Sequence, residues 1–254
     1  MTSTAYNKGY EKAAHLYDIF DNKQNIEFFL HYALEASEIL DIGAGTGRLA
    51  IPLAEKGIKV FCVEPSPAMR REFKKKLSKR SDFSKNIKLT EGDATSFDFG
   101  RRFLTTFLSG TFDHFLDDDE RVASLTNIGR HLKPNGKLIF DVFLSLMKDS
   151  PLSPAGEYQK GNIIYRRFVG GKVISENKKE VTLIFETYKS GKLIEKIEEK
   201  GLVGLINRTK IRHLLKKTGF VITNEFNNYD FTKFKKGDKL LIIEAIYPHT
   251  NTSV

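Results

Sequence analysis

A glycine-rich segment near the start of the chain has the composition of a ligand-binding turn. The stretch DIGAGTGR places Gly43, Gly45 and Gly47 at alternate positions, directly after the apolar run EIL. Glycines at such a point let the backbone turn tightly and approach a ligand without Cβ atoms in the way, and a helix that follows offers free backbone amides. The segment therefore predicts a site for a ligand that the backbone itself approaches closely.

The spacing of these glycines separates the chain from dehydrogenases, which also use a glycine-rich loop. Their fingerprint is GxGxxG/A, in which the third small residue lets the helix pack closely on the strand. Counted from Gly43, the sixth position of that fingerprint is Arg48. Because an arginine does not suit that packing role, the pattern favours a different ligand class.

The reactive residue types elsewhere exclude several chemistries. Cys62 is the single cysteine, so the chain forms no internal disulfide, and no CxxC or HxxxH cluster has the spacing of a metal site. We expect no metal. The neighbours of Cys62, IKVFCVE, are apolar and strand-like, which predicts a packed core thiol and no nucleophile.

The elements that must position the glycine loop follow an alternating pattern. Short apolar runs alternate with amphipathic segments through residue 143, and helices are predicted to start near Arg48, Ser66 and Asp118. Such alternation implies parallel strands joined by right-handed crossovers, with helices on both faces. We therefore expect an α/β fold with a doubly wound sheet. The predicted strands up to this point are 38–42, 59–64, 86–92, 102–108 and 136–143.

The pattern changes near Ser145. Residues 162–202 alternate apolar and polar side chains with period two, and VGGK and KSGK occupy the positions of hairpin turns. This predicts an antiparallel block of about three strands, with SPLSPAG (150–156) as its linker. A helix at 208–219 and strands at 220–226 and 239–247 then resume the first pattern. We expect one domain formed by residues 1–144 and 204–254, with residues 145–203 as an insertion.

Five segments in order resemble the class I S-adenosylmethionine-dependent methyltransferases. The resemblance extends over residues 10–143 and 203–247, and it implies a seven-stranded sheet whose last strand is antiparallel to the other six. The sequence departs from the family pattern in two places. Arg101 and Arg102 stand where the fourth strand usually opens with an apolar residue and Asp, and the acid of the second strand is Glu64, where Asp is also common. The segments are LDIGAGTGR, VEPSPAM (63–69), EGDA (91–94), HLKPNGKLIFDVF (131–143) and LLKKTGFVI (214–222).

The resemblance also implies S-adenosylmethionine as the cofactor and assigns roles to its contacts. Gly43 and Gly45 accommodate the methionine part, Asp41 helps to hold its amino group, and Glu64 accepts from both ribose hydroxyls. Further implied roles are Asp93 accepting from the adenine amine, Pro65 and Met69 flanking the adenine, and Ala44, Ala94 and Leu108 as additional cofactor contacts.

Two residues are candidates for the chemistry of methyl transfer. Tyr17, in AAHLYDIF, matches a YD dipeptide that many of these enzymes carry on an N-terminal helix over the cofactor. His114, in FLSGTFDHFL, stands where the family often has a histidine, and a neutral imidazole can accept a proton from the attacking group. Ordinary core packing is the alternative for both residues.

The insertion follows the fifth strand, so it leaves the sheet at the ligand edge. We expect it to form a lid over the methyl group, because the displacement must exclude water; contact with a second subunit is the alternative. Similar insertions occur in methyltransferases resembling glycine N-methyltransferase and the sugar-amine N-methyltransferases. The leading hypothesis is thus methyl transfer to N or O of a small metabolite, by a monomer or a homodimer.

The positive charge leaves a second hypothesis open. The formal net charge is +9, and MRREFKKKLSKR (69–80) is the densest basic run, although its apolar residues recur every four positions, as in a helix with a solvated basic face. Methylation of RNA or protein is therefore the alternative, and a non-catalytic cofactor-binding module is a third. No segment has the apolar length of a signal peptide core or a membrane span, so we expect a cytoplasmic protein.

Overall fold

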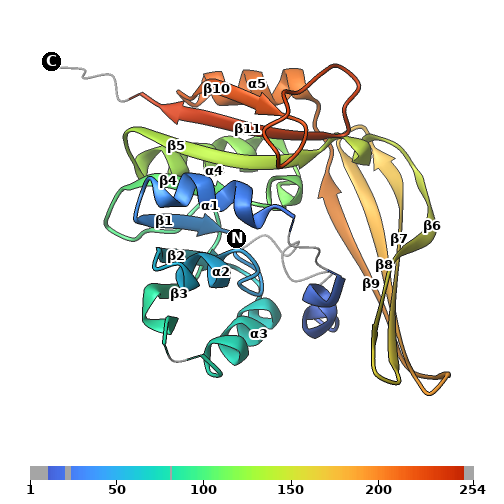
Figure 1. Ribbon diagram of the computed structural model, residues 1–254. Helices are drawn as coiled ribbons and strands as arrows, with labels where there is room; N and C mark the ends of the chain where they lie inside the picture. Colours follow the sequence, from blue (N-terminus) through green and yellow to red (C-terminus); the bar gives the residue numbers. More distant parts are fainter. Residues whose placement is uncertain (1–10, 21–23, 81, 249–254) are drawn as a thin grey trace, which may run out of the picture.

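The larger part of the molecule is a seven-stranded sheet covered by helices on both faces (Figure 1), in a computed structural model that describes residues 11–20, 24–80 and 82–248. The strand order β10-β11-β5-β4-β1-β2-β3 changes direction beside β1, which creates a crevice between β1 and β4. The strands are β1 (Glu38–Ile42), β2 (Lys59–Glu64), β3 (Ile87–Glu91), β4 (Phe103–Leu108), β5 (Leu132–Phe143), β10 (Val221–Phe226) and β11 (Leu240–Tyr247).

The predicted fold class is confirmed. Strands β1 to β5 pair in parallel, and β11 is antiparallel to both of its neighbours, β5 and β10. Alternate residues of each strand point to opposite faces, so Ile39 packs with one apolar cluster and Leu40 with the other. Residues of α1 and α2 cover the first face, and residues of α4 and α5 cover the second.

Helices α2, α3, α4 and α5 begin within two residues of the predicted starts, and side-chain caps fix three of these starts. The Ser66, Asp117 and Asn207 side chains each accept a backbone amide of the following first turn. The helices and 3-10 turns are η2 (Ala14–Phe20), α1 (Ile26–Leu34), α2 (Ala50–Glu55), α3 (Pro67–Leu77), η3 (Ser84–Asn86), η4 (Phe112–His114), α4 (Asp118–Arg130), η5 (Leu144–Met147) and α5 (Arg208–Lys217).

The insertion is an antiparallel sheet of four strands, one more than predicted. The strands are β6 (Ser150–Lys160), β7 (Ile163–Ser175), β8 (Lys178–Lys189) and β9 (Lys192–Gly204), paired in that order. The prediction that 150–156 is a linker is wrong, because these residues form the first half of β6. Pro151 and Pro154 are tolerated there because β6 is an edge strand, and its register with β7 shifts where they lie.

Strand β5 also begins earlier than predicted. The segment LKPNG, most of which precedes the predicted strand 136–143, belongs to β5, which pairs with β4 first at Leu132 and then, after a register shift, at Lys137. Asn135 adopts a φ of +58° within this irregular stretch. Residues 133–136 therefore form an irregular bulge within β5, and the backbone still turns at Asn135.

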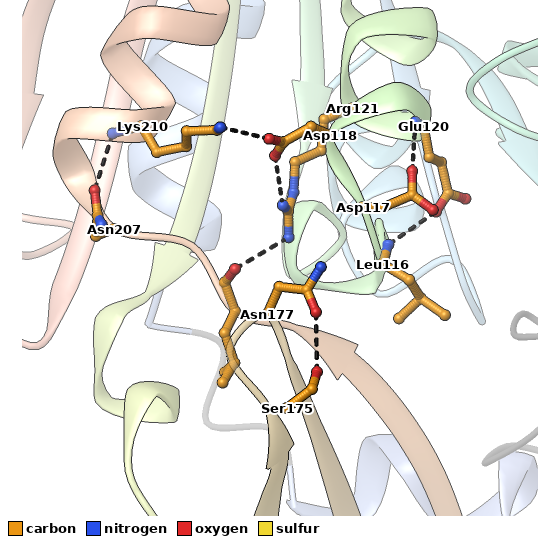
Figure 2. Close-up of polar contacts among 10 residues, drawn as sticks. Leu116, Asp117, Asp118, Glu120, Arg121, Ser175, Asn177, Asn207 and Lys210 are labelled. Carbon is orange, nitrogen blue, oxygen red and sulfur yellow. Dashed lines mark hydrogen bonds and ion pairs between the residues drawn. The ribbon is translucent and has the colours of Figure 1, made fainter.

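A polar hub fixes the point where the insertion returns to the sheet (Figure 2). Arg121 of α4 is only 2% exposed. Its Nη1 atom lies 3.1 Å from Asp118 Oδ1, and its Nη2 atom donates to the Leu205 carbonyl oxygen at 3.5 Å. Lys210 of α5 pairs with the other oxygen of Asp118 at 2.6 Å. This hub joins the end of β9 to α4 and α5.

The short helix η2 lies between the two sheets (Figure 1). Leu16, Ile19 and Phe20 pack with Phe185 of β8, whereas Ala14 and Tyr17 pack against the first turn of α3. Within the described residues, no helix is long and apolar enough to cross a membrane. Cys62 is a fully buried thiol, as predicted. Residues 1–10 and 249–254, which the expected domain bounds include, lie outside the described residues.

Candidate cofactor and acceptor site

A cavity of about 890 Å³, including its part open to solvent, lies at the carboxyl ends of β1, β2 and β4. This is the position at which doubly wound sheets bind their ligands. Most of the residues for which the sequence predicts a role contribute to its wall. Those that do are Tyr17, Asp41, Gly43, Ala44, Gly45, Glu64, Pro65, Met69, Ala94 and His114.

The three glycines of the loop are needed for different reasons. All three have positive φ values, +71° at Gly43, +57° at Gly45 and +82° at Gly47. A Cβ atom would lie 2.3 Å from Thr111 Oγ1 at Gly43, and 2.3 Å from the Phe73 ring at Gly47. At Gly45 a Cβ atom would meet only the Gly43 carbonyl oxygen, at 4.0 Å. Gly43 and Gly47 thus serve packing, whereas Gly45 leaves its side open to the cavity.

Glu64 ends β2 with its carboxylate held by the backbone. Oε2 accepts the amide of Gly45 at 2.7 Å, and Oε1 accepts the amide of Ser66 at 2.7 Å. Burial raises the pKa of the Glu64 carboxyl, while these two amides and Arg70 act in the opposite direction. Because each carboxylate oxygen has two lone pairs, both oxygens keep the capacity to accept one more hydrogen bond.

Asp41, near the end of β1, lines the cavity and has an unsatisfied carboxylate oxygen. Its side chain is buried, and its Oδ2 atom has no hydrogen-bond partner within the part of the chain that the structure describes. Burial raises the pKa of this carboxyl to about 7, although the Arg48 guanidinium acts in the opposite direction. A buried acceptor without a donor is costly. A ligand ammonium group would supply the missing donor.

Arg48 belongs to a polar network beneath the cavity. It donates to Asn25 Oδ1 at 2.6 Å and to Ser109 Oγ at 3.0 Å. Asp141 of β5 accepts the amide of Gly110 at 2.5 Å and the Tyr229 hydroxyl at 2.8 Å. The network therefore fixes the segment after β4, which supplies Ser109, Gly110 and Thr111 to the cavity wall.

The two candidate chemical residues come from different segments but line one cavity. Tyr17 lies on η2 and His114 at the end of η4. Burial lowers the pKa of the His114 imidazole below its usual value. The side chain is therefore neutral at pH 7, which is the form that accepts a proton.

Helix η2 is fixed over the glycine loop by Asp18, which follows Tyr17. The Asp18 carboxylate accepts the Thr46 hydroxyl at 2.6 Å and pairs with the Lys76 ammonium of α3. Lys76 also donates to the Thr46 carbonyl oxygen at 2.8 Å. These contacts hold Tyr17 against the cavity.

Two of the predicted contact residues do not line the cavity. The Asp93 carboxylate accepts the amide of Thr95 at 2.8 Å and the hydroxyl of Ser96 at 3.0 Å, so it caps the turn after β3, while the adjacent Ala94 reaches the wall. Leu108 is buried in the core between the sheet and α4. Sequence reasoning gave no role to Arg48 or Thr111, and the isolated acid in the apolar strand LIFDVF was the available signal for Asp141.

Comparison with known proteins agrees with this geometry. Residues 39–136 match the family described as "Methyltransferase domain". This stretch of the chain therefore resembles a methyltransferase domain. The match runs from β1 into β5, so the domain includes the glycine loop, Glu64 and His114. The resemblance inferred from the motifs is thereby confirmed.

Sequence relatives and solved structures extend the comparison. An uncharacterized methyltransferase of Bacillus thuringiensis (strain Al Hakam) is 34% identical over 148 residues, which are 54% of this chain and 66% of that protein. The chain thus spans just under two thirds of the length of these curated relatives. The larger sheet with its helices and the insertion together share their fold with solved structures, of which two are described next.

The first is an S-adenosylmethionine-dependent methyltransferase from Clostridium acetobutylicum, with a TM-score of 0.75 and 20% identity over 94% of this chain and 99% of that one. The second is the amino pentose methyltransferase CalS10 from Micromonospora echinaspora, solved with S-adenosylmethionine bound. Its TM-score is 0.69, with 17% identity over 92% of this chain and 95% of that one.

Proposed function

We propose that this protein is an enzyme that transfers a methyl group from S-adenosylmethionine to N or O of a small acceptor. The observation that carries the proposal is the combination in one cavity of an unsatisfied Asp41 oxygen, an open backbone at Gly45 and the Glu64 carboxylate. These groups suit, in turn, an ammonium, a closely packed sulfur-bearing chain and a ribose.

The cavity residues fit this cofactor in chemistry as well as in position. Asp41 offers its unpaired oxygen to the amino group of the methionine part. Glu64 keeps free lone pairs for the ribose hydroxyls, because each of its oxygens accepts one backbone amide. Pro65 and Met69 supply apolar surface for the adenine. When bound, the cofactor supplies an electrophilic methyl group on a sulfonium.

The residues of this chain then prepare the acceptor. His114 is neutral at pH 7 and takes a proton from the acceptor's ammonium or hydroxyl group, which exposes the attacking lone pair. Tyr17 presents its ring and hydroxyl on the same cavity. Helix η2 and the four-stranded sheet exclude water, which favours an in-line displacement.

The position of residues 145–203 supports a small acceptor. The end of β9 packs so closely on η4 that a Cβ atom at Gly204 would lie 2.1 Å from the Phe115 carbonyl oxygen, and Phe115 lines the cavity. In this proposal the insertion acts as a lid over the cavity. We include in the proposal a monomeric or homodimeric protein with a cytoplasmic location.

A transfer assay tests the proposal. Protein with radiolabelled S-adenosylmethionine is screened against metabolite amines, hydroxy compounds and total RNA, and we expect label in a small molecule. Label in RNA would support the alternative of a nucleic-acid methyltransferase. Cofactor binding without transfer to any compound would favour a non-catalytic module.

His114→Ala separates catalysis from binding. We expect turnover at pH 7 to fall about 100-fold, the usual contribution of a general base, with cofactor affinity retained. His213→Ala, which removes an exposed histidine of α5, is the control and should leave both quantities unchanged. An unchanged rate in His114→Ala would remove His114 from the mechanism.

A further inference from the structure

Arg167 of the insertion carries hydrogen-bond donors that the described protein does not use. It lies in the middle of β7, opposite Phe185 of β8, so its side chain shares the sheet face that packs on η2. The guanidinium is half-buried. Its carbon lies 5.0 Å from the centre of the Phe20 ring, and its Nη2 atom donates to the Ala155 carbonyl oxygen at 3.0 Å.

The other donors of Arg167 lack acceptors among the residues that the structure describes. Among the described residues, its Nε atom is buried without a hydrogen-bond partner, and no carboxylate forms an ion pair with the guanidinium. Burial lowers the pKa of this group. A partly desolvated cation without a counter-ion lowers the stability of the fold, because the lost hydration is not replaced by a partner.

The neighbouring Arg166 shows what the same side chain does on the other face of β7. Its Nε atom donates to Glu157 at 2.6 Å, and its guanidinium stacks on the Tyr188 ring at 5.1 Å. Arg166 is exposed, yet it has a carboxylate partner. The exposed Arg166 thus has a carboxylate partner, whereas the half-buried Arg167 has none among the described residues. Burial alone would favour the opposite arrangement, because a buried charge needs a partner more than an exposed one does.

Arg167 is linked to the cavity through η2. Tyr17 lines the cavity, and Phe20, three residues later on η2, contacts the Arg167 guanidinium. The four-stranded sheet also reaches the cavity on another side, where Gly204 packs on Phe115. Helix η2 therefore joins the cavity to the face of β7 that carries Arg167.

We propose that Arg167 binds an oxyanion group of the methyl acceptor, a carboxylate or a phosphate, and so selects acceptors that carry one. This inference rests on the proposed methyltransferase function and names the substrate class of the same site. A guanidinium suits the task because its planar fork of donors matches the two oxygens of such groups. The acceptor supplies the counter-ion that the described residues do not provide.

A binding measurement tests the inference without needing turnover. Thermal unfolding of the full chain with S-adenosylhomocysteine is followed with added acetate, with inorganic phosphate and with chloride at matched ionic strength. We expect acetate or phosphate, at several times its Kd, to raise the midpoint by roughly 2–4 °C relative to chloride. Arg167→Gln should lose this rise, Arg167→Lys should keep part of it, and Arg166→Gln should keep it fully.

The pattern of responses separates the possible roles of Arg167. A response to acetate alone identifies a carboxylate, and a response to phosphate alone identifies a phosphate. If Arg167 only holds η2 in place, Arg167→Gln would weaken S-adenosylhomocysteine binding more than threefold and leave any anion response intact, which would overturn the inference. The absence of an anion response in the wild type would also overturn it. Failure of S-adenosylhomocysteine to bind the wild type would contradict the proposed function instead.

Kinetics give a second test once an acceptor is found. Arg167→Gln should lower kcat/KM about 10- to 100-fold for an acceptor with a carboxylate or phosphate, mainly through KM. The amide or the dephosphorylated analogue of that acceptor should show the same loss in the wild type and no further loss in Arg167→Gln. An acceptor without any oxyanion, methylated equally by both proteins, would contradict the inference.

Discussion

The two sheets of this molecule build their cores in different ways. The seven-stranded sheet is buried on both faces, and four of the five residues of β1 are inaccessible to solvent. The four-stranded sheet has an almost fully exposed edge strand, and the buried members of its described apolar cluster are Phe185 together with Ala13 and Leu16 from the N-terminal segment. Its packing therefore depends on a segment that also lines the cavity, through Tyr17.

This difference indicates that the larger sheet provides most of the stability, whereas η2 and the four-stranded sheet act mainly on ligand binding. The larger sheet provides the fixed geometry at Asp41, Gly45 and Glu64, whereas η2 is held from both sides. Asp18 links it to the glycine loop, and the Glu199 carboxylate of β9 accepts the amide of Ala13 at 3.1 Å. A change in the four-stranded sheet should therefore affect ligand binding more than global stability.

The strongest test of this division compares two buried phenylalanines. Phe107 of β4 packs on Phe29 of α1 at 5.0 Å between ring centres, and Phe185 packs on Phe20 of η2 at 5.9 Å. We expect Phe107→Ala to cost about 3–5 kcal/mol of the free energy of unfolding. Phe185→Ala should cost less, yet it should weaken S-adenosylhomocysteine binding, because η2 loses its support. Thermal unfolding and calorimetry measure the two effects.

Two results would contradict the assignment of stability to the larger sheet and of ligand binding to η2. If Phe185→Ala lowers the unfolding midpoint as much as Phe107→Ala does, the four-stranded sheet belongs to the same cooperative core. If it leaves ligand affinity unchanged, η2 does not link the insertion to the cavity.

A smaller effect is expected at the edge of the larger sheet, where Glu64 and Glu91 are register partners on β2 and β3. Glu64→Ala should weaken S-adenosylhomocysteine binding by about 1–3 kcal/mol, because it leaves ribose hydroxyls and backbone amides without an acceptor. Glu91→Ala is the matched control, since that exposed side chain pairs only with Arg70 among the described residues. Equal affinities of wild type and Glu64→Ala would refute the ribose role.

The smallest effect concerns the pH dependence of binding. Burial raises the pKa of Asp41 to about 7, so the carboxyl of the free protein is mostly neutral at pH 6 and mostly ionised at pH 8. Pairing with a ligand ammonium needs the ionised form, so affinity should rise about tenfold over this interval. Asp41→Asn should bind more weakly at pH 8 and lose most of the dependence. A wild-type affinity that falls with rising pH would contradict this role.

The same acid also sets a trend in the stability of the free protein. A carboxyl whose pKa is higher in the folded than in the unfolded state stabilises the fold below the unfolded value and loses that contribution as the pH rises towards 7. Asp41→Asn should therefore flatten the pH dependence of the unfolding midpoint between about pH 4 and pH 7, relative to wild type.

The periodicity of the sequence predicted the larger sheet well, and the smaller one only in part. Runs such as KVFCVE are buried on both faces, so their apolar character is continuous and easily recognised. Strand β6 was missed because an exposed edge strand needs few apolar residues, and its two prolines imitate a linker. Its pairing is decided by β7, which lies later in the sequence.

The motifs predicted the cavity wall better than the support behind it. Gly45 and Glu64 meet there because a parallel sheet brings the ends of successive strands together. Arg48, Thr111 and Asp141 come from separate segments, and their roles depend on tertiary contacts that spacing does not reveal. The packing of Arg167 beside η2 likewise joins segments about 150 residues apart in the sequence.

The central claim is that the cavity beyond β1 and β2 binds S-adenosylmethionine, and a calorimetric titration with its product tests the claim most directly. Wild-type protein titrated with S-adenosylhomocysteine at pH 8 should bind one molecule per chain, with a Kd on the order of micromolar. NADH, whose pyrophosphate the loop is not expected to hold, should give no heat of binding. A folded protein that binds NADH and ignores S-adenosylhomocysteine would contradict the account.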